Sequence, residues 1–235
     1  MIVAAVFLPH PPLLLREYAS LADPGADLRG RCRGALSEAA RLGVDRWVVL
    51  TGVDRTAPGI STRAPLGQRV AEELLDGVDL FQPNPGNSVL QSASTPHPEP
   101  VQRTELPGLR VLPVPFDADG AEVADAGSRL VALSGDVRTA VLVMGDGSAR
   151  RGEKAPGHLD ERAFAFDDLV VGALAAGDPG PLKDLDAELA AELLVAGRAA
   201  WQVMAAAAPG PARVVSTHAE DPFGVLYPVT VWRWA

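Results

Sequence analysis

Short apolar runs alternate with helical patterns along most of the chain. Val141-Leu142-Val143-Met144 is a continuous apolar run, and such runs are typical of central strands that are buried on both faces. The runs that predict strands are Ile2–Leu8, Arg46–Thr51, Leu109–Val114, Thr139–Met144, Arg213–Thr217 and Val225–Trp232.

Helical spacing of apolar residues separates most of these runs. In Asp27–Leu42 the apolar residues recur every three or four positions, and Gly43 provides a C-terminal stop. Further helices are predicted over Leu66–Leu75, Glu122–Leu133 and Leu159–Ala175. The alanine-rich stretch Leu182–Ala208 predicts either two helices or one helix with a kink near Gly197.

Strands that alternate with helices predict an α/β fold, with a central, mostly parallel (mixed) sheet flanked by helices. The last two strand runs are joined directly by Glu220-Asp221-Pro222, which predicts a C-terminal antiparallel strand pair. Because no repeat and no sharp change of composition marks a boundary, residues 1–235 are interpreted as a single domain. The stretch Asn84–Pro100, rich in Pro, Asn and Ser, is interpreted as a long surface loop that contains His97.

Composition excludes several classes of protein. Hydrophobic residues make up 47% of the chain, enough for a sizeable core, yet no segment approaches the roughly 20 consecutive apolar residues of a membrane span. The run Ile2–Leu8 lacks the flanks of a signal peptide and is interpreted as a buried strand. The single cysteine, Cys32, excludes an internal disulfide and a cysteine-rich metal site. The net charge of −9 argues against nucleic-acid and membrane partners, so we expect a soluble cytoplasmic protein.

Polar residues follow three of the predicted strands. The first strand runs into Pro9-His10-Pro11-Pro12, the second into Asp54, and the fourth into Gly145-Asp146-Gly147-Ser148. In open α/β sheets, ligands bind beyond the carboxyl ends of the strands. We therefore expect these three loops to converge on one cleft.

His10 is the strongest single candidate. Prolines on both sides restrict its backbone and hold the imidazole in a set direction. An imidazole directly after a buried strand is well placed to bind a metal or to move a proton. The alternative, a partly buried histidine bonded to a backbone carbonyl, stays open.

The turn that contains Asp146 and Ser148 is followed by Arg150, Arg151 and Lys154. Such a turn beside basic side chains could hold an anion, although a plain turn with solvated arginines is the commoner arrangement. Its spacing fits neither a Walker loop nor the dinucleotide-binding fingerprint.

Two further histidines are candidates for acid–base chemistry. His158 directly precedes a predicted helix, where a capping or surface role is commoner. His218 follows a strand and lies near Glu220 and Asp221, a grouping that suits a metal or acid–base cluster but is often only polar at a hairpin turn.

Taken in order, these segments resemble the class III extradiol dioxygenase superfamily. That superfamily includes the β-subunit of protocatechuate ring-opening enzymes, the DOPA-dioxygenase-like enzymes and the Memo-like proteins. The segments that carry the resemblance are Leu8-Pro9-His10-Pro11-Pro12, Val48-Val49-Leu50-Thr51-Gly52, Gly145-Asp146-Gly147-Ser148, Ala155-Pro156-Gly157 leading to Phe166-Asp167, and Asp221-Pro222-Phe223-Gly224-Val225-Leu226-Tyr227.

The resemblance implies a mononuclear non-haem site for Fe(II), or another divalent metal, held by two histidines and a carboxylate. His10 matches the first metal histidine. At the second position this chain offers Asp54, and Glu192 is the candidate for the carboxylate ligand. The acid–base histidine of the superfamily falls at Ala149, which cannot transfer a proton.

Three hypotheses follow, of which we favour the first. The first is a divergent member with a remodelled or incomplete metal site, which binds a small, anionic molecule around His10, Asp54, Asp146 and Ser148, with Arg150 and Arg151 as counter-charge. The second is an active Fe(II)-dependent dioxygenase acting on a catechol-type substrate, with His158 or His218 as the base. The third is a non-catalytic subunit or interaction module that self-associates or pairs with a partner subunit.

Overall fold

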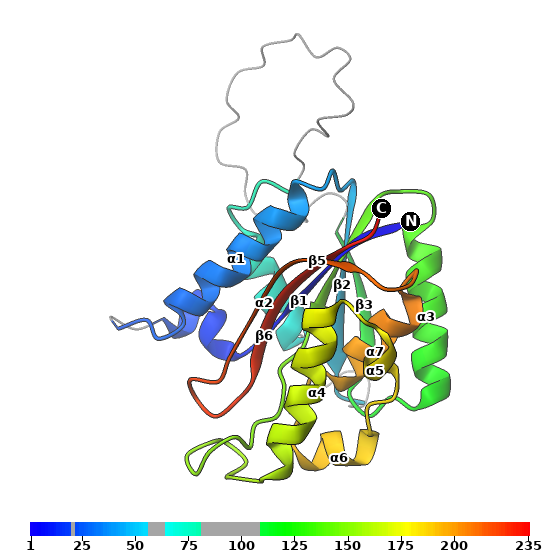
Figure 1. Cartoon of the computed structure of the whole chain (residues 1–235). Coiled ribbons are helices and arrows are strands. Elements are labelled where there is room, and N and C mark those ends of the chain that lie inside the picture. Colours follow the sequence, from blue (N-terminus) through cyan, green and yellow to red (C-terminus); the bar gives the residue numbers. More distant parts are fainter. Residues whose placement is uncertain (20–21, 56–63, 81–108) are drawn as a thin grey trace.

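Six strands form one mixed sheet in the part of the chain that the structure, a computed structural model, describes: residues 1–19, 22–55, 64–80 and 109–235 (Figure 1). The predicted surface loop Asn84–Pro100, with His97, lies outside these residues. The strands are β1 (Ile2–Leu8), β2 (Arg46–Val53), β3 (Leu109–Pro115), β4 (Thr139–Met144), β5 (Arg213–Glu220) and β6 (Tyr227–Arg233).

The order of the strands is β3-β2-β4-β1-β6-β5. The first four strands of the chain pair in parallel, and β6 pairs antiparallel with both β1 and β5. The predicted α/β class and the C-terminal antiparallel pair are therefore confirmed. Because β1 and β6 are neighbours, the start of β6 meets the carboxyl ends of β1 and β4 at one edge of the sheet.

Helices cover both faces of this sheet. On one face lie α1 (Ala26–Ala40) and α2 (Leu66–Leu75), as Figure 1 shows. The opposite face is covered by α3 (Gly120–Ser134), α4 (Arg162–Ala176), α5 (Gly180–Lys183), α6 (Ala187–Glu192) and α7 (Arg198–Ala207). Successive strand residues point to opposite faces, so Val48 and Val49 belong to different apolar clusters. This two-sided burial explains why the strands are continuous apolar runs.

Most predicted elements are present, with shifted ends. The third helical pattern begins at Gly120, the fifth strand continues to Glu220, and the last strand begins at Tyr227. The first alternative for Leu182–Ala208, two helices, is confirmed by α6 and α7, with Gly197 directly before α7; α5 begins earlier, at Gly180, and only its end reaches into this stretch. The side chain of Asp186 accepts hydrogen bonds from two amides and starts α6, and Leu194 adopts a positive φ of 58° after it.

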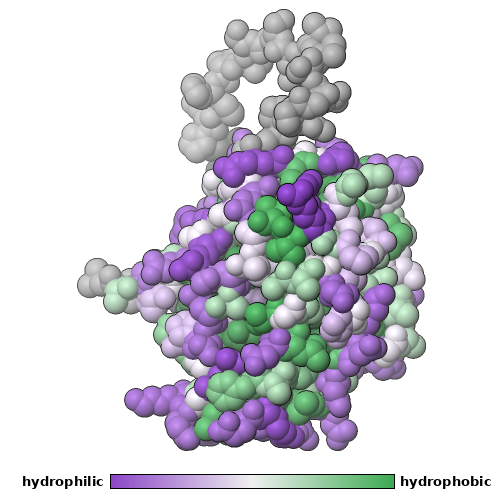
Figure 2. Space-filling model, viewed as in Figure 1, coloured by the Kyte–Doolittle hydropathy of each residue, from purple (hydrophilic) through white to green (hydrophobic). Residues whose placement is uncertain are grey.

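Polar side chains cover most of the face seen in Figure 2, and hydrophobic ones form broken patches. The large apolar side chains that are exposed come from separate elements, including Val131 on α3, Leu169 on α4 and Val215 on β5. Within the described ranges, no helix is both long enough and apolar enough to cross a membrane.

Candidate functional site

His10 and Asp146 meet just beyond the carboxyl ends of two neighbouring strands. Leu8 at the end of β1 lies opposite Met144 at the end of β4, and each candidate follows two residues later. The backbone N–H of His10 donates a hydrogen bond of 2.7 Å to Oδ1 of Asp146, and the ring Nδ1 of His10 lies 3.8 Å from the same oxygen. The loop after β1 and the loop after β4 therefore converge, as predicted.

The imidazole of His10 is almost enclosed, since the residue is only 4% exposed. Its Nδ1 is buried and makes no hydrogen bond to any residue that the structure describes. Bonding of this nitrogen to a backbone carbonyl is therefore not observed. An unpaired buried polar atom costs roughly 1–3 kcal/mol of stability, so buried polar atoms in proteins are normally hydrogen-bonded. The Nδ1 atom of His10 departs from this rule among the described residues.

The segment after His10 is anchored to α1 by a buried arginine. Pro11 precedes a short 3₁₀ turn over Pro12–Leu14. Arg29 donates hydrogen bonds of 3.1 Å to the carbonyls of Leu13 and Leu14, and its charge pairs with Asp23 at 2.8 Å. The prolines and this anchor together fix the direction in which the imidazole points.

The carboxyl group of Asp146 is mostly buried, with its side chain 15% exposed. Burial raises its pKa, and the neighbouring His10 opposes that rise. The Asp146 charge in turn helps to raise the pKa of the Tyr227 phenol and of the Cys32 thiol, after burial as the main cause in each case. Hydrogen bonds from Gly145 to Leu8 and from Gly147 to Leu226 place Asp146 between the end of β1 and the start of β6. Cys32, with no exposed surface, is a packed thiol as its helical position suggests.

Ser148 belongs to a second buried network. Its amide and its hydroxyl donate to the carboxylate of Asp167 on α4, at 3.0 and 2.5 Å. Arg151 pairs with Asp167 at 3.2 Å and with Asp221 at 2.6 Å, and thereby ties the loop after β4 to the β5–β6 turn. Burial raises the pKa of Asp167, while Ser148 and Arg151 oppose the rise. Ser148 is therefore an anchor of this loop and is not paired with His10.

The arginines predicted as counter-charge are already engaged. Arg151 makes the two ion pairs just described and lies over the Phe164 ring, 4.7 Å from its centre. Arg150 donates to the carbonyl of Gly157 at 2.5 Å. Four amides of the turn, at positions 145, 147, 148 and 149, already donate to Leu8, Leu226, Asp167 and Leu193. Most amides of the turn and the charge of Arg151 are thus already used, and Arg150 keeps one unpaired Nε atom, so little of the predicted anion site is left free.

The three predicted metal ligands do not form one group. Asp54 is exposed beyond the end of β2, on the other side of β4 from His10. Glu192, at the end of α6, is half-exposed and pairs with Arg162 at 2.7 Å. In the described part of the chain, no three His, Cys, Asp or Glu side chains are placed to hold a metal ion. The residues present therefore do not fit the mononuclear iron site that the resemblance implies.

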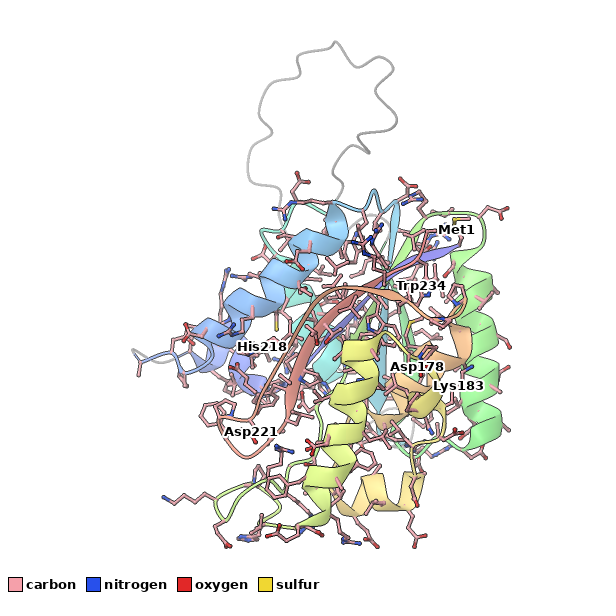
Figure 3. The ribbon with its side chains drawn as sticks, viewed as in Figure 1. Met1, Asp178, Lys183, His218, Asp221 and Trp234 are labelled. Carbon is pink, nitrogen blue, oxygen red and sulfur yellow. The ribbon has the colours of Figure 1, made fainter. Side chains whose placement is uncertain are left out.

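The other two candidate histidines lie away from this pair. His158 is exposed in the loop before α4, where its φ is 58°. His218 is on the edge strand β5, with Nε2 3.3 Å from Glu220. Figure 3 shows His218 and Asp221 together on the β5–β6 hairpin. No hydrogen bond or ion pair among the described residues joins either histidine to His10 or Asp146.

Two of the hollows that the described residues form are large, and His10 lines neither of them. One, of about 500 Å³, lies between Met1, Trp234 and the residues after α7, at the far end of the sheet from Asp221 (Figure 3). The other, of about 390 Å³, lies beside β3 and the start of α3.

Sequence reasoning found His10, Asp146 and Ser148 but did not select Asp167 or Tyr227 as site residues. A signal for Asp167 exists, because it is a carboxylate within the buried stripe of α4, which also includes Phe166 and Val170. No protein-family model matches the chain, and a search of curated proteins finds no significant match.

Proposed function

We propose that this chain is a divergent class III extradiol dioxygenase-like protein, with a remodelled metal site, that binds a small polar molecule at His10 and Asp146. One observation carries the proposal: a buried imidazole nitrogen without a partner lies 3.8 Å from a mostly buried carboxylate. Buried polar groups in native proteins are nearly always paired, and strand ends are where α/β sheets bind ligands. A bound polar molecule would supply the absent partner.

Ring cleavage through Fe(II) is not part of this proposal. Asp54 and Glu192, the candidates for the other two ligands, do not form a group with His10. Ala149 stands where the acid–base histidine of the superfamily falls. Positioned proton transfer is typically worth ~100- to 10,000-fold in rate, so its loss alone would slow turnover severely. We therefore propose the fold of this superfamily with binding in place of its chemistry.

A comparison of two histidine variants tests the proposal. A collection of small polar molecules is screened for those that raise the melting temperature of the wild-type protein. We expect these molecules to stabilise the His158→Ala variant equally, because that histidine is exposed and remote, but to lose most of their effect on His10→Ala. Equal stabilisation of both variants by every molecule would contradict binding at His10.

Anaerobic loading with Fe(II), followed by metal analysis, tests the remodelled metal site separately. We expect far less than one iron per chain, because the described residues give His10 no second and third ligand. About one iron per chain, lost in His10→Ala, would restore the hypothesis of an active dioxygenase.

A further inference from the structure

We propose that the molecule bound at His10 and Asp146 carries a positively charged amine group, so that the site recognises an organic ammonium. The inference rests on the proposed function and adds the chemical class of the ligand. It follows from which polar groups at this site are free and which are already used.

Asp146 is a carboxylate without a compensating cation. It is mostly buried, yet its one ion-pair partner among the described residues is His10, which is charged only when protonated. Buried charges in proteins are normally paired, because removing a charge from water is costly. The nearby arginines do not supply this charge: Arg29 is held by Asp23, and Arg151 by Asp167 and Asp221.

The unpaired Nδ1 atom of His10 can act as an acceptor beside the Asp146 carboxylate. In the tautomer that carries its proton on Nε2, the Nδ1 atom of His10 accepts a hydrogen bond, and it lies 3.8 Å from Oδ1 of Asp146. Several donors that could hold an anion are used, since the His10 amide donates to Asp146 and the amides at positions 145, 147, 148 and 149 donate elsewhere. An ammonium group has three donors and no acceptor, and therefore complements this pair.

The surroundings of the pair also favour a cation. Glu220, near α1, already has Arg31 within 3.9 Å, whereas Asp146 has no arginine or lysine partner among the described residues. A divalent metal ion is the less suitable occupant, because the described residues supply no third ligand.

Three probes of the same shape test the inference: benzylamine, benzyl alcohol and benzoate. Their affinities at neutral pH are measured by calorimetry on the wild-type protein and on Asp146→Asn, which keeps an oxygen for the His10 amide. Asp178→Asn is the matched control, because Asp178 caps α5 and lies on a different part of the molecule (Figure 3).

We expect benzylamine to bind at least tenfold more tightly than benzoate. Asp146→Asn should weaken benzylamine at least tenfold and leave benzyl alcohol almost unchanged, whereas Asp178→Asn should match the wild type. Binding of benzoate or benzyl alcohol in preference to benzylamine, lost in His10→Ala, would overturn the amine inference but retain the proposed function. Binding of none of the three would overturn both, and stoichiometric binding of Zn²⁺ that depends on His10 would replace the amine with a metal.

Discussion

Gly145 makes the closest approach between β4 and α7, directly before Asp146. A Cβ atom added at this position would lie 2.4 Å from the Cα of Gly197, a distance that forces the two backbones apart. We expect Gly145→Ala to lower the free energy of unfolding by about 1–3 kcal/mol, because overpacking strains a closely packed contact. Urea denaturation monitored by circular dichroism provides the measurement.

Gly30 provides the matched control for this prediction. It is exposed within α1, and a Cβ atom there would meet nothing within 4 Å. Gly30→Ala should therefore raise the free energy of unfolding by about 0.5–1 kcal/mol, since alanine is the better helix former. If both variants changed stability in the same direction, the close contact at Gly145 would not be the cause.

At the scale of single residues, the sequence predicted the polar residues that follow the strands. It did not predict the contacts that those residues make with helices docked from elsewhere in the chain. His10 and Asp146 could be paired in advance, because neighbouring parallel strands end at one edge of a sheet. The partner of Ser148 could not, because Asp167 lies 19 positions further along the chain and reaches it only through the docking of α4. The two ion pairs of Arg151 likewise depend on the docking of α4, which carries Asp167, and on the β5–β6 turn, which carries Asp221.

At the scale of elements, the start of α3 is fixed by reciprocal hydrogen bonds. The Asp119 side chain accepts from the amide of Glu122, and the Glu122 side chain accepts from the amide of Asp119. We expect Asp119→Ala to lower the free energy of unfolding by about 1 kcal/mol, because it leaves an N-terminal amide of the helix unpaired. Asp125→Ala, in the exposed middle of α3, should cost little or nothing by the same urea measurement.

The same helix start predicts a dependence on pH. The guanidinium of Arg55 lowers the pKa of Glu122 from its usual value of 4.5 to about 2, with help from the Asp119 amide. Because the folded protein binds this proton more weakly than the unfolded chain, the stabilisation is complete above pH 4.5 and is lost as the pH falls towards 2.

Glu122→Gln tests this dependence, because glutamine keeps the capping hydrogen bonds but carries no charge. We expect the variant to be less stable than the wild type at pH 6 and the difference to shrink by pH 3. A difference that stays constant over this range would show that the Arg55 ion pair contributes nothing to stability.

Clear periodic patterns predicted both the type and the ends of an element, whereas less clear patterns left the ends uncertain. The prediction Leu66–Leu75 matches α2, and Thr139–Met144 matches β4, because each is a clear apolar pattern with a defined end. The alanine-rich stretch left two alternatives open, because alanine suits a helix and does not mark where one ends. Its breaks are set by Asp186, which caps α6, and by the turn at Leu194.

At the scale of the whole molecule, one sheet connects two apolar clusters. Residues of β1, β2 and β4 alternate between them, so neither cluster can lose its helices without exposing a continuous apolar face of the sheet. The sequence predicted this layered class but not the strand order, because the placement of β1 between β4 and β6 joins segments that are far apart along the chain. Folding must therefore bring the first and the last strand together.

The shared sheet predicts that both clusters unfold together in a single transition. Trp47 packs on the side of α1 and α2, whereas Trp201 and Trp232 pack on the opposite side. With 5-fluorotryptophan in place of tryptophan, ¹⁹F NMR follows each ring separately through a urea titration. We expect the Trp47 and Trp232 signals to change at the same urea concentration, as a two-state transition requires. A lower midpoint for Trp47 would mean that the side with α1 and α2 melts alone, and residues 1–235 would then not be one cooperative domain.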